Sequence, residues 1–412
     1  MPHVGFGGLL IVVAIAFAAP VVLGLAPRVR LPAVVLEIVA GIIVGPSVLG
    51  LVRLDLPIQI LSTIGLAFLL FLAGMEIDLT HLALPVVRLT GLAFICTIGL
   101  ALATGYALFV PGLVRSPLLI AIILMATSLG LIVPVLKDAG EESTRFGQLV
   151  IAAASIADFG AVILLSLFFS RQASSPITSL VLLGGFLIVA SFVVLGASRL
   201  QRVMRVTALF TRLQDTTAEI RVRASIFLLL GFVALAQTTG LETILAAFLA
   251  GAAVRLIDRD QTRTHPNFHL KLEAIGYGFL IPVFFIGSGV QFELHALVSS
   301  ASGLLRVPLF VIALLVVRGL PAVLYRPSMG TTRAIAAALL QATSLPFIVA
   351  ASAIGLDLGL LTPATGAALV GAGLVSVIAF PLLALGLLRN SKSAPDRVQR
   401  IQSAKIARGG DP

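Results

Sequence analysis

Residues 126–133 read ATSLGLIV and residues 342–349 read ATSLPFIV, so nearly the same string occurs twice in one chain. A second echo pairs IGLAFL at 64–69 with IGYGFL at 275–280. Close packing of helices favours small residues, but it does not require the same string at two places. The chain is therefore predicted to consist of two related halves.

Both copies lie in long apolar runs. Of the 412 residues, 59% are hydrophobic and 11% are charged, and the mean hydropathy is +1.13. A soluble domain carries about 25% charged residues, whereas about 20 apolar residues cross a membrane as a helix. The sequence predicts an all-α polytopic membrane protein. Its thirteen expected transmembrane segments are 6–25, 31–50, 58–75, 89–110, 118–136, 147–170, 177–195, 224–239, 241–257, 274–289, 307–324, 334–354 and 360–388.

The basic residues predict the orientation of these segments. With thirteen segments, one side of the membrane holds only Arg53, Arg115, Arg171 and Arg306, Arg318 falls within a segment, and all other Lys and Arg lie on the opposite side. Because cytoplasmic loops are enriched in Lys and Arg, we expect the amino terminus outside and the carboxyl terminus in the cytoplasm of a bacterial cell. The net charge of +10 is then topological, and no nucleic-acid partner is expected.

The ATSL repeat indicates the class of function. Segments 118–136 and 334–354 are an odd number of segments apart, so they cross the membrane in opposite directions. Inverted repeats with interrupted helices at matching positions are typical of secondary transporters. Here we expect Gly130, Pro134 and Pro346 to interrupt the two helices. Close packing of small residues is the alternative interpretation.

Asp158 lies near the centre of segment 147–170, where a carboxylate costs about 2.5–3.5 kcal/mol on insertion scales. An ionised carboxylate can bind a small cation, and a protonated one is neutral, which favours a cation and proton relay. A structural carboxylate bonded between helices is the alternative. The hydroxyls expected to support the ion, with nearby carbonyls, are those of Thr127, Ser128, Thr343 and Ser344.

Arg318 lies within segment 307–324 and has two interpretations. Its long side chain could snorkel to the cytoplasmic surface. Alternatively it compensates the charge of Asp158 by pairing with it whenever no cation is bound. Because Arg stays protonated, Asp158 alone would carry the exchanged charge, and exchange of one H⁺ for one monovalent cation would be electroneutral. The sequence lacks phosphate-binding loops and nucleophile motifs, so we expect no enzyme, no cofactor and no resident metal.

Three further stretches resemble the monovalent cation:proton antiporter superfamily, in its Kef and Nap-like sodium/hydrogen exchanger branch. They are LEIVAGIIVGPSVLG at 36–50, FLLFLAGME at 68–76 and TRFG at 144–147. The resemblance implies a homodimer in the lipid bilayer, two crossing broken helices and an elevator movement. The implied divisions are a dimer domain (1–80 and 222–300), a transport core (81–171 and 301–388), a linker helix with its cytoplasmic loop (172–221) and a basic cytoplasmic tail (389–412).

One position departs from that family. Its members carry Asp, Asn or Gln directly before the essential Asp, whereas this chain has Ala157. A scheme with two carboxylates thereby loses a partner, which agrees with electroneutral exchange. The sequence thus predicts an antiporter that exchanges Na⁺ or K⁺ for H⁺ in the plasma membrane. A channel-like K⁺ efflux pathway and an anion or organic-solute carrier with Arg318 as its anion site remain as alternatives.

Overall fold

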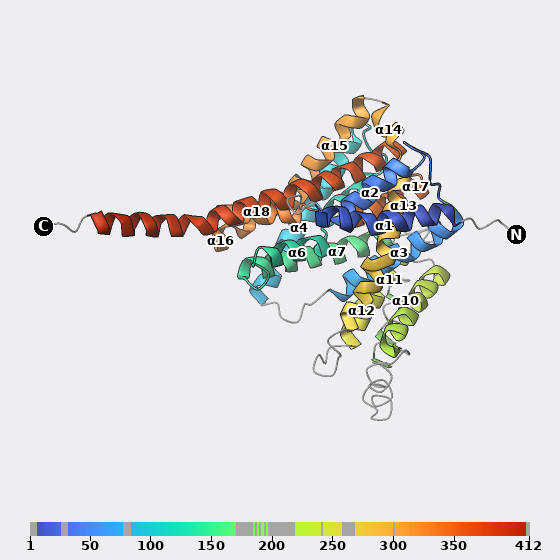
Figure 1. The fold of residues 1–412 in the computed structure, drawn as a ribbon, viewed down its shortest axis with the longest axis horizontal. Coiled ribbons are helices and arrows are strands. Elements are labelled where there is room, and N and C mark those ends of the chain that lie inside the picture. The colour runs from blue at the N-terminus through green and yellow to red at the C-terminus, as the bar shows by residue number, and fades with distance from the viewer. Residues whose placement is uncertain are drawn as a thin grey trace. The chain divides into compact units, whose positions relative to one another are not determined.

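A computed structural model describes residues 6–25, 32–76, 84–169, 219–239, 242–257, 268–299 and 301–408, together with single positions between 184 and 196. All regular secondary structure in these ranges is helical (Figure 1). The expected segment 177–195 and most of the linker region 172–221 lie outside the described residues. The expected all-α fold is confirmed.

Within the described residues, nine helical stretches are long and apolar enough to cross a membrane. Two shorter apolar helices, Ala33–Val44 and Thr243–Ile257, lie within the expected segments 31–50 and 241–257. The stretch Gly303–Asp357 contains two expected segments. It is divided at Gly330, whose φ of 81° favours glycine and breaks the helical backbone.

The chain forms two compact units that interleave along the sequence. Unit 1 comprises Met1–Leu79, Phe159–Ser300 and Ile354–Gly359, and unit 2 comprises Thr80–Asp158, Ala301–Ala353 and Leu360–Pro412. Each half of the sequence contributes to both units.

Unit 1 is built around two pairs of closely packed helices. Its elements are α1 (Gly7–Leu25), α2 (Ala33–Val44), α3 (Leu56–Met75), α10 (Ile220–Thr239), α11 (Thr243–Ile257), α12 (Phe268–Ile275), the π-helical turn η1 (Gly276–Leu280), α13 (Ile281–Val290) and α14 (Leu294–Val298). Helix α2 packs against α13, and α3 packs against α11. Asp55 caps α3, because its carboxylate accepts a hydrogen bond from Ile58 N at 3.2 Å.

Glycines let the helices of unit 1 touch at the backbone. A methyl group on Gly74 of α3 would collide with the Phe248 carbonyl of α11, and one on Gly251 of α11 would collide with the Phe71 carbonyl of α3. A methyl group on Gly41 of α2 would likewise collide with the Ile286 carbonyl of α13. Small residues permit such close approach between helices in a bilayer. Unit 1 is therefore held by direct contacts between main chains.

Unit 2 contains two interrupted helices, one broken at residues 126–128 and the other at residues 342–345. Its elements are α4 (Leu84–Phe109), α5 (Pro117–Met125), α6 (Leu129–Asp138), α7 (Arg145–Phe169) as far as Asp158, α15 (Ala301–Leu314), the π-helical η2 (Leu315–Gly319), the 3₁₀-helical η3 (Leu320–Tyr325), α16 (Arg326–Gln341), α17 (Pro346–Asp357) as far as Ala353, and α18 (Pro363–Arg408). Helix α18 packs against α15 and α16. Ile132, Phe146 and Leu340 belong to one buried apolar cluster that joins α6, α7 and α16.

Candidate ion-binding site

The first interruption separates α5 from α6. Helix α5 ends at Met125, Ala126 and Ser128 have extended backbone conformations, and α6 begins at Leu129. Ser128 occupies the N-cap position of α6, yet its side chain makes no capping hydrogen bond. The first amide groups of α6 therefore require another acceptor.

Asp158 of α7 supplies that acceptor. Its Oδ1 accepts a hydrogen bond from Thr127 N at 3.1 Å, and its Oδ2 accepts one from Leu129 N at 3.1 Å. The carboxylate thus faces the positive end of the α6 dipole, where a negative charge is stabilised. Its residue remains partly accessible. The structure therefore anchors both oxygens of the expected ion ligand.

The second interruption crosses the first. Helix α16 ends at Gln341, and Pro346 opens α17, the position at which proline fits a helix best. Ser128 N donates a hydrogen bond to the Thr343 carbonyl at 3.0 Å, and Thr127 Oγ1 donates one to the Gln341 carbonyl at 2.8 Å. The two copies of the ATSL string thus lie side by side at one point in unit 2.

The helix breaks lie elsewhere than the sequence suggests. Gly130 and Pro134 both lie inside α6, after the interruption, and Pro346 starts a helix without breaking one. The breaks at 126–128 and 342–345 occur where Asp158 and the partner segment accept or donate the hydrogen bonds that a helix would otherwise supply. The expectation that Gly130 and Pro134 interrupt the first helix is therefore wrong in position.

The four expected ligand hydroxyls differ in their availability. The hydroxyl of Thr343 donates to the Leu339 carbonyl at 3.1 Å, and that of Thr127 donates to the Gln341 carbonyl. The Ser344 hydroxyl is buried and has no hydrogen-bond partner among the described residues, whereas Ser344 N is bonded to Ser376 Oγ at 3.2 Å. Ser128 is 8% exposed beside the carboxylate. Of the four hydroxyls, those of Thr127 and Thr343 are thus engaged with main-chain carbonyls.

Arg318 is fully enclosed in unit 2. It lies on η2 with 2% exposure, so its side chain does not snorkel to a surface. Its Nε donates to Thr127 Oγ1 at 2.7 Å and its Nη1 donates to Thr97 Oγ1 at 3.3 Å. Among the ion pairs of the described residues, none joins Arg318 to Asp158. Both charged groups are instead held by Thr127, one through its hydroxyl and the other through its amide.

Two residues of this site are not evident from the sequence. Gln341 directly precedes the second ATSL string, whereas Met125 precedes the first. The position before the string therefore differs between the two copies, and comparing them does not indicate Gln341. Thr97 is one of three threonines in the apolar helix α4, and its hydroxyl also donates to the Ala93 carbonyl at 3.0 Å. A polar residue in a membrane segment was the available signal in both cases.

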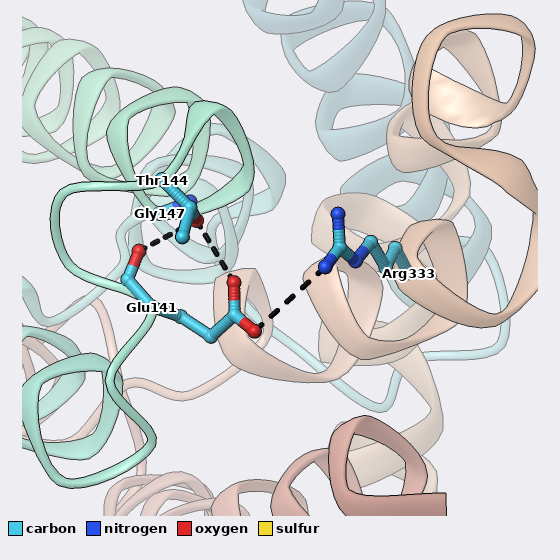
Figure 2. A network of polar contacts seen from close by, with 4 residues as sticks. All are labelled: Glu141, Thr144, Gly147 and Arg333. Atoms are coloured by element: carbon cyan, nitrogen blue, oxygen red, sulfur yellow. Dashed lines mark hydrogen bonds and ion pairs between the residues drawn. The ribbon is translucent and has the colours of Figure 1, made fainter. Parts of the chain in front are cut away.

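Glu141 forms a separate polar network between α6 and α7 (Figure 2). Its side chain is 1% exposed and its Oε2 accepts a hydrogen bond from Thr144 Oγ1 at 2.8 Å. The same hydroxyl accepts from Gly147 N at 3.1 Å, and Arg333 Nη2 of α16 lies 3.8 Å from Glu141 Oε1. The network therefore ties the α6–α7 connection to the helix that carries the second interruption.

We expect Glu141→Gln and Arg333→Gln to destabilise the protein less together than the sum of their separate effects. Gln keeps an acceptor for Thr144 but loses the charge, so each single change should cost about 1 kcal/mol or less, because Arg333 is 40% exposed. Melting temperatures of the two single variants and the double variant in detergent measure the coupling. Strict additivity of the two changes would mean that the ion pair contributes nothing.

Interrupted helices at matching positions in two halves of a chain are typical of secondary transporters with inverted repeats. Residues 13–385 match the family described as sodium/hydrogen exchanger, transmembrane. The chain belongs to this family, as the resemblance in its sequence implies.

Individual relatives agree with this assignment. The chain is 32% identical over 396 residues to YjbQ of Bacillus subtilis, which covers 92% of this chain and 62% of YjbQ, so the chain spans less than two thirds of that relative. It is 29% identical over 274 residues to the Na⁺/H⁺-K⁺ antiporter GerN of Bacillus cereus, over 65% of this chain and 67% of GerN. The structure of the sodium proton antiporter MjNhaP1 from Methanocaldococcus jannaschii superposes with a TM-score of 0.63 at 17% identity, covering 92% and 97% of the two chains, and shares the fold.

Proposed function

We propose that the protein exchanges Na⁺ or K⁺ for H⁺ across the membrane, with Asp158 as the shared binding group. The observation that carries the proposal is the carboxylate of Asp158, which two main-chain amides hold at the crossing of the interrupted helices. Membership of the sodium/hydrogen exchanger family supports cation and proton exchange as the activity.

The hydrogen bonds at Asp158 leave room for either ion. Each carboxylate oxygen has two lone pairs and accepts one amide hydrogen bond, so each retains capacity for a cation or a proton. A cation binds most favourably to the ionised carboxylate, and a bound proton neutralises the carboxylate. The two ions therefore compete for one group, and this competition couples their transport.

The charges at the site favour electroneutral exchange. Ala157 precedes Asp158, so the adjacent position supplies no second carboxylate. Arg318 stays protonated throughout the cycle. One H⁺ exchanged for one monovalent cation then moves no net charge.

The choice between Na⁺ and K⁺ and the mode of movement are also proposals. Oxygen ligands suit both ions, and the name of GerN includes both. We propose that unit 2, which carries Asp158, moves as an elevator and that unit 1, with its main-chain crossings, forms the dimer domain. The basic residues support an outer amino terminus and a cytoplasmic carboxyl terminus in the plasma membrane.

Reconstitution into liposomes with an internal pH dye tests the proposal. After acid loading, addition of external Na⁺ or K⁺ should alkalinise the interior, and a clamp on the membrane potential should leave the rate unchanged. A rate that depends on the potential would refute electroneutrality while retaining exchange. Passive cation flux without proton movement would indicate a channel, and proton movement that requires an anion and no cation would indicate an anion carrier.

A further inference from the structure

The guanidinium of Arg318 is incompletely bonded for a buried charge. Its Nε and Nη1 are bonded to Thr127 and Thr97, but its Nη2 is buried without a hydrogen-bond partner among the described residues. A buried cation is stable only when its donors are matched by acceptors. The Nη2 end of the guanidinium therefore keeps donors that no acceptor among the described residues satisfies.

Two further buried polar groups of the same unit lack a partner among the described residues. The hydroxyl of Tyr325 and the Nε2 of Gln341 are buried without partners, and both residues are at most 1% exposed. Gln341 is close to Arg318, because its carbonyl accepts a hydrogen bond from the Thr127 hydroxyl to which Arg318 Nε donates. Tyr325 ends η3, which follows directly on η2, the element that carries Arg318. Tyr325 also packs in the apolar cluster that includes Leu340 of α16. The phenolic oxygen of Tyr325 is a suitable acceptor for a guanidinium donor, whereas the unmatched Nε2 of Gln341 is itself a donor, so only the side-chain oxygen of Gln341 can accept from Arg318.

Cation binding would oppose the resting contacts. The Thr127 hydroxyl donates to the Gln341 carbonyl and accepts from Arg318 Nε, while the Thr127 amide holds Asp158. A cation at Asp158 would lie close to the guanidinium, and two like charges repel strongly where little water screens them. The cation and the resting position of Arg318 are therefore competitors.

We propose that Tyr325 and Gln341 form a second position for the Arg318 guanidinium, which it occupies when a cation binds at Asp158. In the cation-free protein, Arg318 is bonded to Thr127 and Thr97. On cation binding its head group shifts along η2 toward the Tyr325 hydroxyl and the Gln341 side-chain oxygen. The inference rests on the proposed function and makes Tyr325 and Gln341 positioning residues that set cation affinity through Arg318.

The variant Tyr325→Phe tests the second position. The full chain is purified, and its melting temperature is measured across a series of NaCl and KCl concentrations at constant ionic strength, because a ligand that binds the folded protein raises its stability according to its Kd. Losing an acceptor for a charged donor should raise the apparent Kd for the cation about tenfold or more. The cation-free melting temperature should stay equal or rise, because Phe removes an unsatisfied buried hydroxyl. Gln341→Leu should also weaken cation binding.

Tyr106→Phe is the matched control, since Tyr106 is 57% exposed on α4, and its Kd should be unchanged. In an Arg318→Gln background, Tyr325→Phe should no longer change the Kd for the cation.

An equal change of the Kd in both backgrounds would overturn the proposal, because the effect of Tyr325→Phe would then not pass through Arg318. An unchanged Kd in Tyr325→Phe itself would overturn it as well. If neither ion stabilises the folded wild-type protein and neither drives exchange in liposomes, the proposed function itself fails.

Discussion

Asp158→Asn should reduce cation-driven alkalinisation of acid-loaded liposomes to the rate of liposomes without protein. The amide of Asn cannot ionise, so it can neither release a proton nor offer a charged ligand to Na⁺ or K⁺. The loss should hold for both ions and at every pH tested. Residual exchange that still depends on pH would remove Asp158 from the role of shared binding group.

Loss of exchange must be separated from loss of folding. The carbonyl oxygen of Asn can replace one carboxylate oxygen as acceptor for Thr127 N or Leu129 N, but its NH₂ group cannot accept the other hydrogen bond. A decrease in stability of about 1–3 kcal/mol is therefore expected, and the variant should remain folded in detergent without any cation-dependent rise in melting temperature. Asp357→Asn is the control, because it neutralises an exposed carboxylate at the end of α17 and should retain exchange.

Gly251→Ala should cause the largest loss of stability among conservative changes in unit 1. The added methyl group would meet the Phe71 carbonyl and approach the Met75 amide, so α3 and α11 would have to separate. Overpacking of this kind costs about 1–3 kcal/mol and occasionally more, and a backbone obstacle cannot rotate away as a side chain can. Melting temperature and the yield of folded protein in detergent should both fall.

Gly231→Ala is the matched control for this change. Gly231 lies exposed on α10 in the same unit, with nothing within 4 Å of the added methyl group. Because Ala favours a helix more than Gly does, by about 1 kcal/mol, this variant should be as stable as the wild type or more so. Equal stability of the Gly251 and Gly231 variants would show that the α3–α11 crossing tolerates a wider spacing.

The sequence predicted the site in outline but not the contacts within it. Asp158 was evident because a carboxylate in an apolar segment is costly, and the repeated ATSL string was evident because identity between distant segments needs no structural knowledge. The bonds from Thr127 and Leu129 to Asp158 depend on how α6 meets α7, which no local pattern encodes. The same holds for Glu141, which reads as a loop residue but is buried against Thr144.

The sequence by itself determined that the protein is an all-α membrane protein, and it predicted two related halves and an acidic group inside the membrane. The length of the apolar segments, the distribution of charge and the internal similarity are properties of the chain alone. They indicate these features because apolar segments favour lipid and charged loops favour water. Only the tertiary structure decided that the breaks precede Gly130 and Pro134, and that Arg318 is bonded to Thr127 and not to Asp158. A helix stops where another segment can satisfy its main-chain groups, and a buried guanidinium bonds the acceptors within its reach, so both outcomes depend on residues distant in sequence.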